Sequence, residues 1–130
     1  MGRASSLRVA TSAAQSRPAG AFPVAHIDLV EEARQLRASP MPHGHVAKTV
    51  LRNSDLRVVM MVLKRGTKVP THHARGSLAI QVLDGRLVVT LLDTGFDLAA
   101  GNVLAIESDV EHALIAIEDT AVMLTVAHRQ

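Results

Sequence analysis

Short runs of apolar and β-branched residues follow one another from about residue 46 to residue 127. Each run has the length and composition of a single β-strand. The sequence therefore predicts seven strands in this part of the chain: 46–51, 56–63, 78–83, 87–92, 103–106, 113–117 and 121–127.

The breaks between these runs contain Gly, Asn, Asp and Ser, which are the residues that turns favour. They fall at residues 53–55, 65–66, 84–85, 93–95, 100–102 and 118–119. Turn signals about 8 to 12 residues apart, without helices between them, are typical of an antiparallel sandwich or barrel. We therefore expect an all-β fold.

One segment before the strands has a different period. Asp28 stands where the N-cap of a helix would be, with Glu31 three residues later, as in a capping box. The apolar residues that share one face of this helix are Leu29, Ala33 and Leu36. Prolines at 40 and 42 end the pattern, because proline lacks an N–H donor and disfavours helix in the residue before it. The sequence predicts one short helix over residues 28–37.

Two of the predicted strands, within 58–63 and 122–126, are apolar on both faces instead of alternating with polar residues. One face would fill the interior of the barrel, and the other would need a cover. A second copy of the chain is the simplest cover, so we expect a homodimer.

Composition limits the class of protein. The 130 residues suffice for one domain with a real core, and 48% of them are hydrophobic. No apolar stretch approaches the roughly 18 residues that cross a bilayer, so we expect no membrane association and a soluble, cytoplasmic protein. The absence of Cys excludes disulfides, zinc ribbons and thiol catalysis. With no Trp or Tyr and only two Phe, the chain lacks the aromatic surface on which bases of single-stranded nucleic acid stack.

The first 24 residues are rich in Ala, Ser and Arg and contain no acid. We expect them to form a flexible tail, with a single domain over residues 25–130. The composition is also that of an organelle transit peptide, whereas the apolar stretch of a secretory signal is absent. Three arginines of this tail account for the net charge of +2, because eleven basic residues then remain against twelve acidic ones. A nearly neutral body gives no indication of nucleic-acid binding.

Two histidines lie forty residues apart, and each follows a segment that begins with a glycine. His72 ends the segment that starts at Gly66, and His112 ends the segment that starts at Gly101. The run 80–87 between them contains an Asp-Gly turn. If the strands close into a barrel, the two histidines come together, and the pattern then indicates a small metal or ligand pocket.

This arrangement resembles the cupin superfamily over residues 45–127. Gly66, His72 and Gly85 match the first glycine, first histidine and last glycine of the first cupin motif, and Gly101 and His112 match the ends of the second. The resemblance implies a double-stranded β-helix, or jelly-roll barrel. A full cupin site holds a divalent metal on three histidines and one glutamate.

The remaining motif positions differ from the family pattern. The second histidine of the first motif falls on Ala74 and the glutamate on Leu78. The Pro, Gly and Asn of the second motif fall on Glu107, Asp109 and Ala116. Two of the four implied metal ligands therefore remain, His72 and His112, and two imidazoles are a poor site for a first-row ion that takes four to six ligands.

Two further histidines are candidate ligands for one divalent ion, which would be Fe, Mn, Ni or Zn. His73 could turn inward only at a β-bulge, because successive side chains of a strand point to opposite faces; otherwise it is a surface histidine. His45 shares the same-face spacing of two with His43 and could reach the pocket from the preceding segment.

Polar residues near the motifs have two interpretations each. Gln81 could bind a ligand through its amide, or it lies on the outer face if its apolar neighbours point inward. One of three acids near His112 could orient the imidazole, or all three belong to a solvated loop; they are Glu107, Asp109 and Glu111.

Three classes of function follow. The chain is a small-molecule binding protein of unassigned activity that uses His72 and His112, with or without a divalent metal. Alternatively, it is a metal-dependent dioxygenase or isomerase acting on a small organic substrate, as other cupins are. The third alternative is a structural barrel without a working site.

Overall fold

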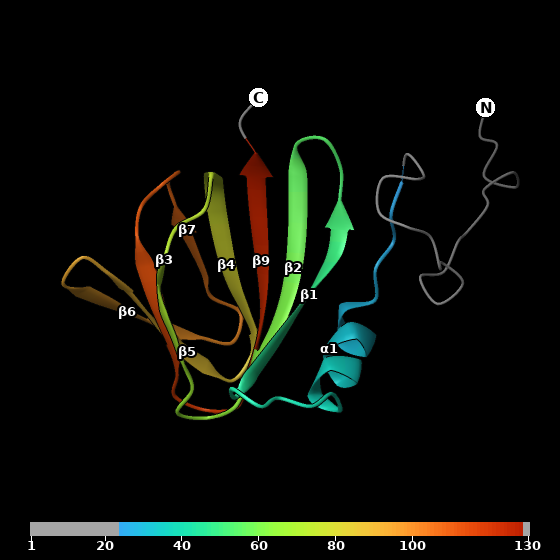
Figure 1. The fold of residues 1–130 in the computed structure, drawn as a ribbon, viewed down its shortest axis with the longest axis horizontal. Helices are drawn as coiled ribbons and strands as arrows, with labels where there is room; N and C mark the ends of the chain where they lie inside the picture. The colour runs from blue at the N-terminus through green and yellow to red at the C-terminus, as the bar shows by residue number, and fades with distance from the viewer. Residues whose placement is uncertain (1–23, 129–130) are drawn as a thin grey trace, which may run out of the picture.

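The computed structural model describes residues 24–128 and consists of one helix and two antiparallel β-sheets (Figure 1). The predicted tail, residues 1–24, lies outside the described residues except for Val24. Helix α1 covers Leu29–Arg37, and its N-cap is Asp28, whose carboxylate accepts a hydrogen bond from the Glu31 backbone N–H at 3.1 Å. The predicted helix and its cap are therefore confirmed.

The larger sheet has five strands in the spatial order β1-β2-β9-β4-β7. Their bounds are His45–Arg52 for β1, Leu56–Leu63 for β2, Thr120–His128 for β9, Gly76–Asp84 for β4 and Val103–Ile106 for β7. The smaller sheet has four strands in the order β3-β8-β5-β6. Their bounds are Lys68–His72 for β3, His112–Ala116 for β8, Arg86–Leu91 for β5 and Thr94–Ala99 for β6.

All seven predicted strands are present, and the structure adds β3 and β6, which the sequence analysis missed. These two strands are the edges of the smaller sheet. An edge strand tolerates Pro70 in β3, since its N–H side need not pair. Residues 93–95 were predicted as a turn. The turn instead covers residues 92–93, and β6 already begins at Thr94.

The core lies between the two sheets. Successive side chains of a strand point to opposite faces, so every second side chain points inward. In β4, for example, Leu78, Ile80 and Val82 are buried. They pack with buried residues of the smaller sheet in one cluster, which includes Leu87, Val89, Leu98 and Leu114.

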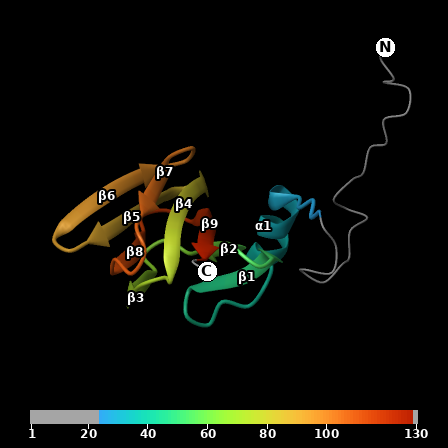
Figure 2. The same ribbon diagram turned by 90° about the horizontal axis from the view of Figure 1, so that it is seen from above.

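Helix α1 covers the outer face of the larger sheet beside β1 and β2 (Figure 2). Its buried residues Ala33 and Leu36 pack against Met60, Val62 and Ala121. The strands that are apolar on both faces are therefore covered in part by the chain's own helix, and the homodimer stays a prediction. Among the described residues, no helix is long and apolar enough to span a membrane.

Candidate functional site

His72 and His112 face one another across two neighbouring strands. His72 ends β3, His112 begins β8, and the antiparallel register pairs them directly. Their ring centroids are 4.2 Å apart, and the ring planes meet at 64° in an edge-to-face arrangement. His112 is only 2% exposed, whereas His72 is exposed. The structure thus brings together the two histidines that the motifs singled out.

Backbone carbonyls hold both rings in a defined orientation. His72 Nδ1 lies 2.9 Å from the carbonyl oxygen of Pro70, and His112 Nδ1 lies 3.0 Å from that of Val110. A carbonyl oxygen can only accept, so each Nδ1 carries the proton. In the neutral ring Nε2 is then left with a free lone pair. The group that orients His112 is thus a backbone carbonyl, not one of the three acids considered from the sequence.

The environment of His112 favours its neutral form. Burial lowers the pKa of His112 below the ordinary value of 6.5, and nearby His72 and His73 lower it further. The hydrogen bond to the Val110 carbonyl opposes this effect without cancelling it. His112 is therefore a hydrogen-bond acceptor at neutral pH, through Nε2.

A pocket of about 370 Å³ surrounds the two rings at one end of the sandwich. It lies where β9 ends and β2 begins, at the top of Figure 1. Apolar side chains form part of its wall: Val59, Ala74, Leu78, Leu124 and Val126. The remaining lining residues are nitrogen-bearing: Arg57, His72, His73, Arg75, His112 and His128. No acidic residue is among those that line it.

Arg57 is a lining residue that the sequence analysis missed, as are Arg75 and His128. It pairs in register with buried Val126, so its side chain points to the interior face of β2. Its Nε is buried and has no hydrogen-bond partner. None of the ion pairs in the described part of the chain involves this guanidinium. The available signal was an arginine on the same face of β2 as Val59 and Met61.

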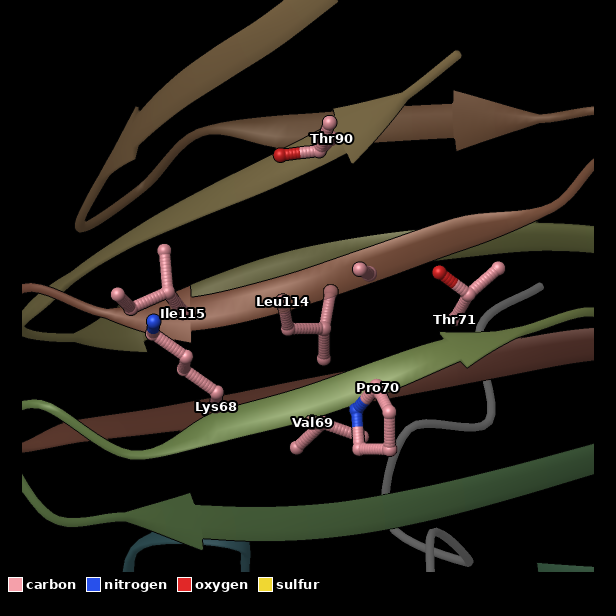
Figure 3. A pocket seen from close by; sticks show the side chains of 8 residues that line it. Lys68, Val69, Pro70, Thr71, Thr90, Leu114 and Ile115 are labelled. Carbon is pink, nitrogen blue, oxygen red and sulfur yellow. The ribbon is translucent and has the colours of Figure 1, made fainter. Parts of the chain in front are cut away.

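A second hollow, of about 560 Å³, lies over β3, β8 and β5 (Figure 3). Thr90, Ala113 and Ile115 contribute to it from the face that points away from the core, because their neighbours Val89 and Leu114 are buried. Lys68 is its one charged lining residue. It contains neither of the paired histidines.

Comparison with known proteins identifies the family. A family model described as a cupin domain matches residues 59–128. The chain belongs to the cupin family. No curated protein sequence matches this cupin.

Solved structures agree with this fold. A conserved protein of unknown function from Streptococcus pyogenes has a TM-score of 0.68 at 20% identity, over 90% of this chain and 98% of the other. A cupin superfamily protein from Desulfitobacterium hafniense has a TM-score of 0.69 at 13% identity, over 87% and 100%. KdgF from a Halomonas species has a TM-score of 0.62 at 23% identity, over 71% and 87%. At these identities the likeness shows the jelly-roll fold of this cupin, not an activity.

The other predicted site residues fall in three places. His73 lines the pocket from one residue beyond the end of β3, and the irregular register of β3 falls before it, between Val69 and His72. His45 pairs with Leu63 and lies at the opposite end of β2 from Arg57, so it does not approach the pocket. Gln81 pairs with Met123 on the outer face of the larger sheet and does not line the pocket.

The residues of this cupin do not fit a complete divalent metal site. Across the described residues, no group of three or more His, Asp or Glu side chains is placed to hold a metal ion. Leu78 lines the pocket where the family pattern has its glutamate, so the anionic ligand is replaced by an apolar wall. The paired histidines provide two imidazole ligands, which is fewer than the four to six ligands that first-row ions take.

Proposed function

We propose that this cupin binds a small, mainly apolar organic molecule in the pocket around His72 and His112. The observation that carries the proposal is the pair of rings whose Nδ1 atoms are held by Pro70 and Val110, which leaves two Nε2 acceptors at an apolar wall. An apolar pocket with a few oriented polar groups is typical of small-molecule sites. The ligand would carry a hydroxyl or N–H group that donates to Nε2.

The size of the pocket supports a compact ligand. At about 370 Å³ it is near the lower end of the roughly 300 to 1,000 Å³ range of small-molecule pockets. A single substituted ring or a short branched acid fills such a volume. Because His112 is buried while His72 is exposed, the ligand would enter past His72.

Thermal unfolding in the presence of phenol tests the proposal, with toluene as the match that lacks a hydroxyl donor. Circular dichroism is the suitable signal, because the chain has neither Trp nor Tyr. Binding at 100 times Kd stabilises a protein by about 2.7 kcal/mol. We expect phenol to raise Tm in a saturable manner in the wild type and in His43→Ala, an exposed loop control, but not in His72→Ala.

A metal-dependent enzyme is the second candidate, and one observation favours it: the free Nε2 atoms are those with which histidines bind metals. Plasma mass spectrometry of protein purified without chelator tests it. Near one equivalent of Fe, Mn, Ni or Zn, lost in both His72→Ala and His112→Ala, would establish the metal. If neither metal nor phenol binds, the chain is a structural barrel.

A further inference from the structure

Arg57 is placed in the pocket without any group to neutralise it. Its Nε is buried and unpartnered, and no acid lines the pocket. A buried donor that lacks a hydrogen bond destabilises the folded protein. A ligand in the pocket would supply the hydrogen-bond acceptor that Arg57 Nε lacks.

The lining of the pocket divides into an acceptor side and a donor side. His72 and His112 present Nε2 lone pairs, which accept hydrogen bonds. Arg57 presents N–H donors, and exposed Arg75 adds a second positive charge at the same pocket. A planar guanidinium matches a carboxylate, to which it can donate two parallel hydrogen bonds.

We propose that the ligand is a small hydroxycarboxylic acid with an apolar body, whose carboxylate is bound by Arg57 and whose hydroxyl donates to the histidine pair. This inference rests on the proposed function and specifies its ligand. The hydroxyl must be part of it, because a carboxylate placed directly on the two Nε2 atoms would meet lone pairs instead of donors. The apolar body lies against the wall that includes Leu78 and Val126.

Isothermal titration calorimetry with two matched pairs of probes tests this assignment. The acids are 4-hydroxybenzoate and mandelate, which place the hydroxyl far from and next to the carboxylate. Their amides, 4-hydroxybenzamide and mandelamide, have the same shape without the charge. We expect at least one acid to bind the wild type roughly tenfold or more tightly than its amide, since charge-assisted hydrogen bonds are among the strongest.

Variants of Arg57 identify the residue that provides the charge. Arg57→Met keeps most of the stem and removes the guanidinium, and we expect it to weaken the acid by roughly 10- to 100-fold without affecting the amide. Arg57→Lys keeps the charge but not the fork, so its affinity should be intermediate. Arg65→Met is the control, because it removes the same charge from an exposed turn. At about 3.3 Å per residue of β2, this turn lies roughly 20 Å from Arg57.

Stability distinguishes a binding role from a structural one. If Arg57 serves the ligand, apo Arg57→Met unfolds at the same or a higher temperature than the wild type, because an unsatisfied buried donor is gone. A lower Tm would identify Arg57 as a structural residue and overturn the assignment. Equal binding of acid and amide in the wild type would overturn the carboxylate but leave the small-molecule pocket intact. Failure of both acids, with phenol still binding, would overturn the hydroxycarboxylic acid alone.

Discussion

His112 is a buried base, and its burial makes the stability of the fold depend on pH. Its pKa in the folded state is below 6.5, the ordinary value that applies after unfolding. The unfolded state therefore binds more protons as pH falls below 6.5, and the stability that neutral His112 contributes, complete above 6.5, is lost as pH falls toward the folded pKa.

We expect the free energy of unfolding to decrease between about pH 7 and pH 5, and this decrease to be smaller in His112→Gln, which cannot be protonated. Urea denaturation followed by circular dichroism at several pH values measures the difference. His43→Gln, in an exposed loop, is the matched control and should keep the wild-type pH dependence. Parallel curves for His112→Gln and the wild type would show that His112 does not titrate as its burial implies.

Gly76 begins β4 opposite His128, beside the pocket. Its φ of +145° is rare for residues with a side chain, and an added Cβ would meet the carbonyl oxygen of Ala127. Gly66 also has a positive φ, of +86°, but nothing lies within 4 Å of an added Cβ. Gly66→Ala should therefore cost about 1 kcal/mol of stability, and Gly76→Ala more than about 2 kcal/mol, as measured by urea denaturation. Equal losses would contradict the close backbone approach at Gly76.

The site residues differ in how far the sequence predicts them. His72 and His112 stand in glycine-bounded frames that resemble the cupin motifs, and the structure pairs them. Arg57 stands in no motif, and its inward direction depends on the register between β2 and β9, which sequence alone does not give. The sequence also does not show at which end of the sandwich His45 lies, because that depends on its pairing with Leu63. His45 was therefore wrongly expected near the pocket.

Among the elements, the strands with apolar runs were predicted, including β1 and β7 at the edges of the larger sheet, whereas the two edge strands of the smaller sheet were missed. Strands β3 and β6 have one paired neighbour each, and their sequences contain Lys68, Pro70, Gly95 and Asp97, which are weak strand formers. Pairing with β8 and β5 makes them strands. Helix α1 was predictable because its cap and its apolar face are both local signals.

The cover that α1 provides can be tested within the helix. Leu36 is 6% exposed and packs in the cluster with Met60 and Val62, whereas Val30 on the same helix is 81% exposed. We expect Leu36→Ala to lower the free energy of unfolding by about 2 to 4 kcal/mol through the cavity that it leaves. Val30→Ala should leave stability unchanged or slightly raised, because Ala is the better helix former. Equal, small effects of both changes would show that α1 does not cover the sheet.

For the whole molecule, the homodimer remains a prediction, although part of the apolar face that was expected to need a second copy is covered by α1. Helix α1 covers the larger-sheet face around Met60, and the hollow over β3, β8 and β5 is an outer face of the smaller sheet that α1 does not cover. Light scattering after gel filtration should give twice the monomer mass. A monomer mass at all concentrations would show that α1 alone is a sufficient cover.

The central claim is that His72 and His112 present a pair of Nε2 hydrogen-bond acceptors in a ligand pocket, and ring ¹⁵N NMR of the histidines tests it most directly. Signals are assigned with His72→Gln and His112→Gln, and 4-hydroxybenzoate is then added near pH 7.5. We predict that both rings carry their proton on Nδ1 and that the Nε2 signals shift as the probe binds. Protons on Nε2, or Nε2 signals that neither this probe nor phenol changes, would contradict the account.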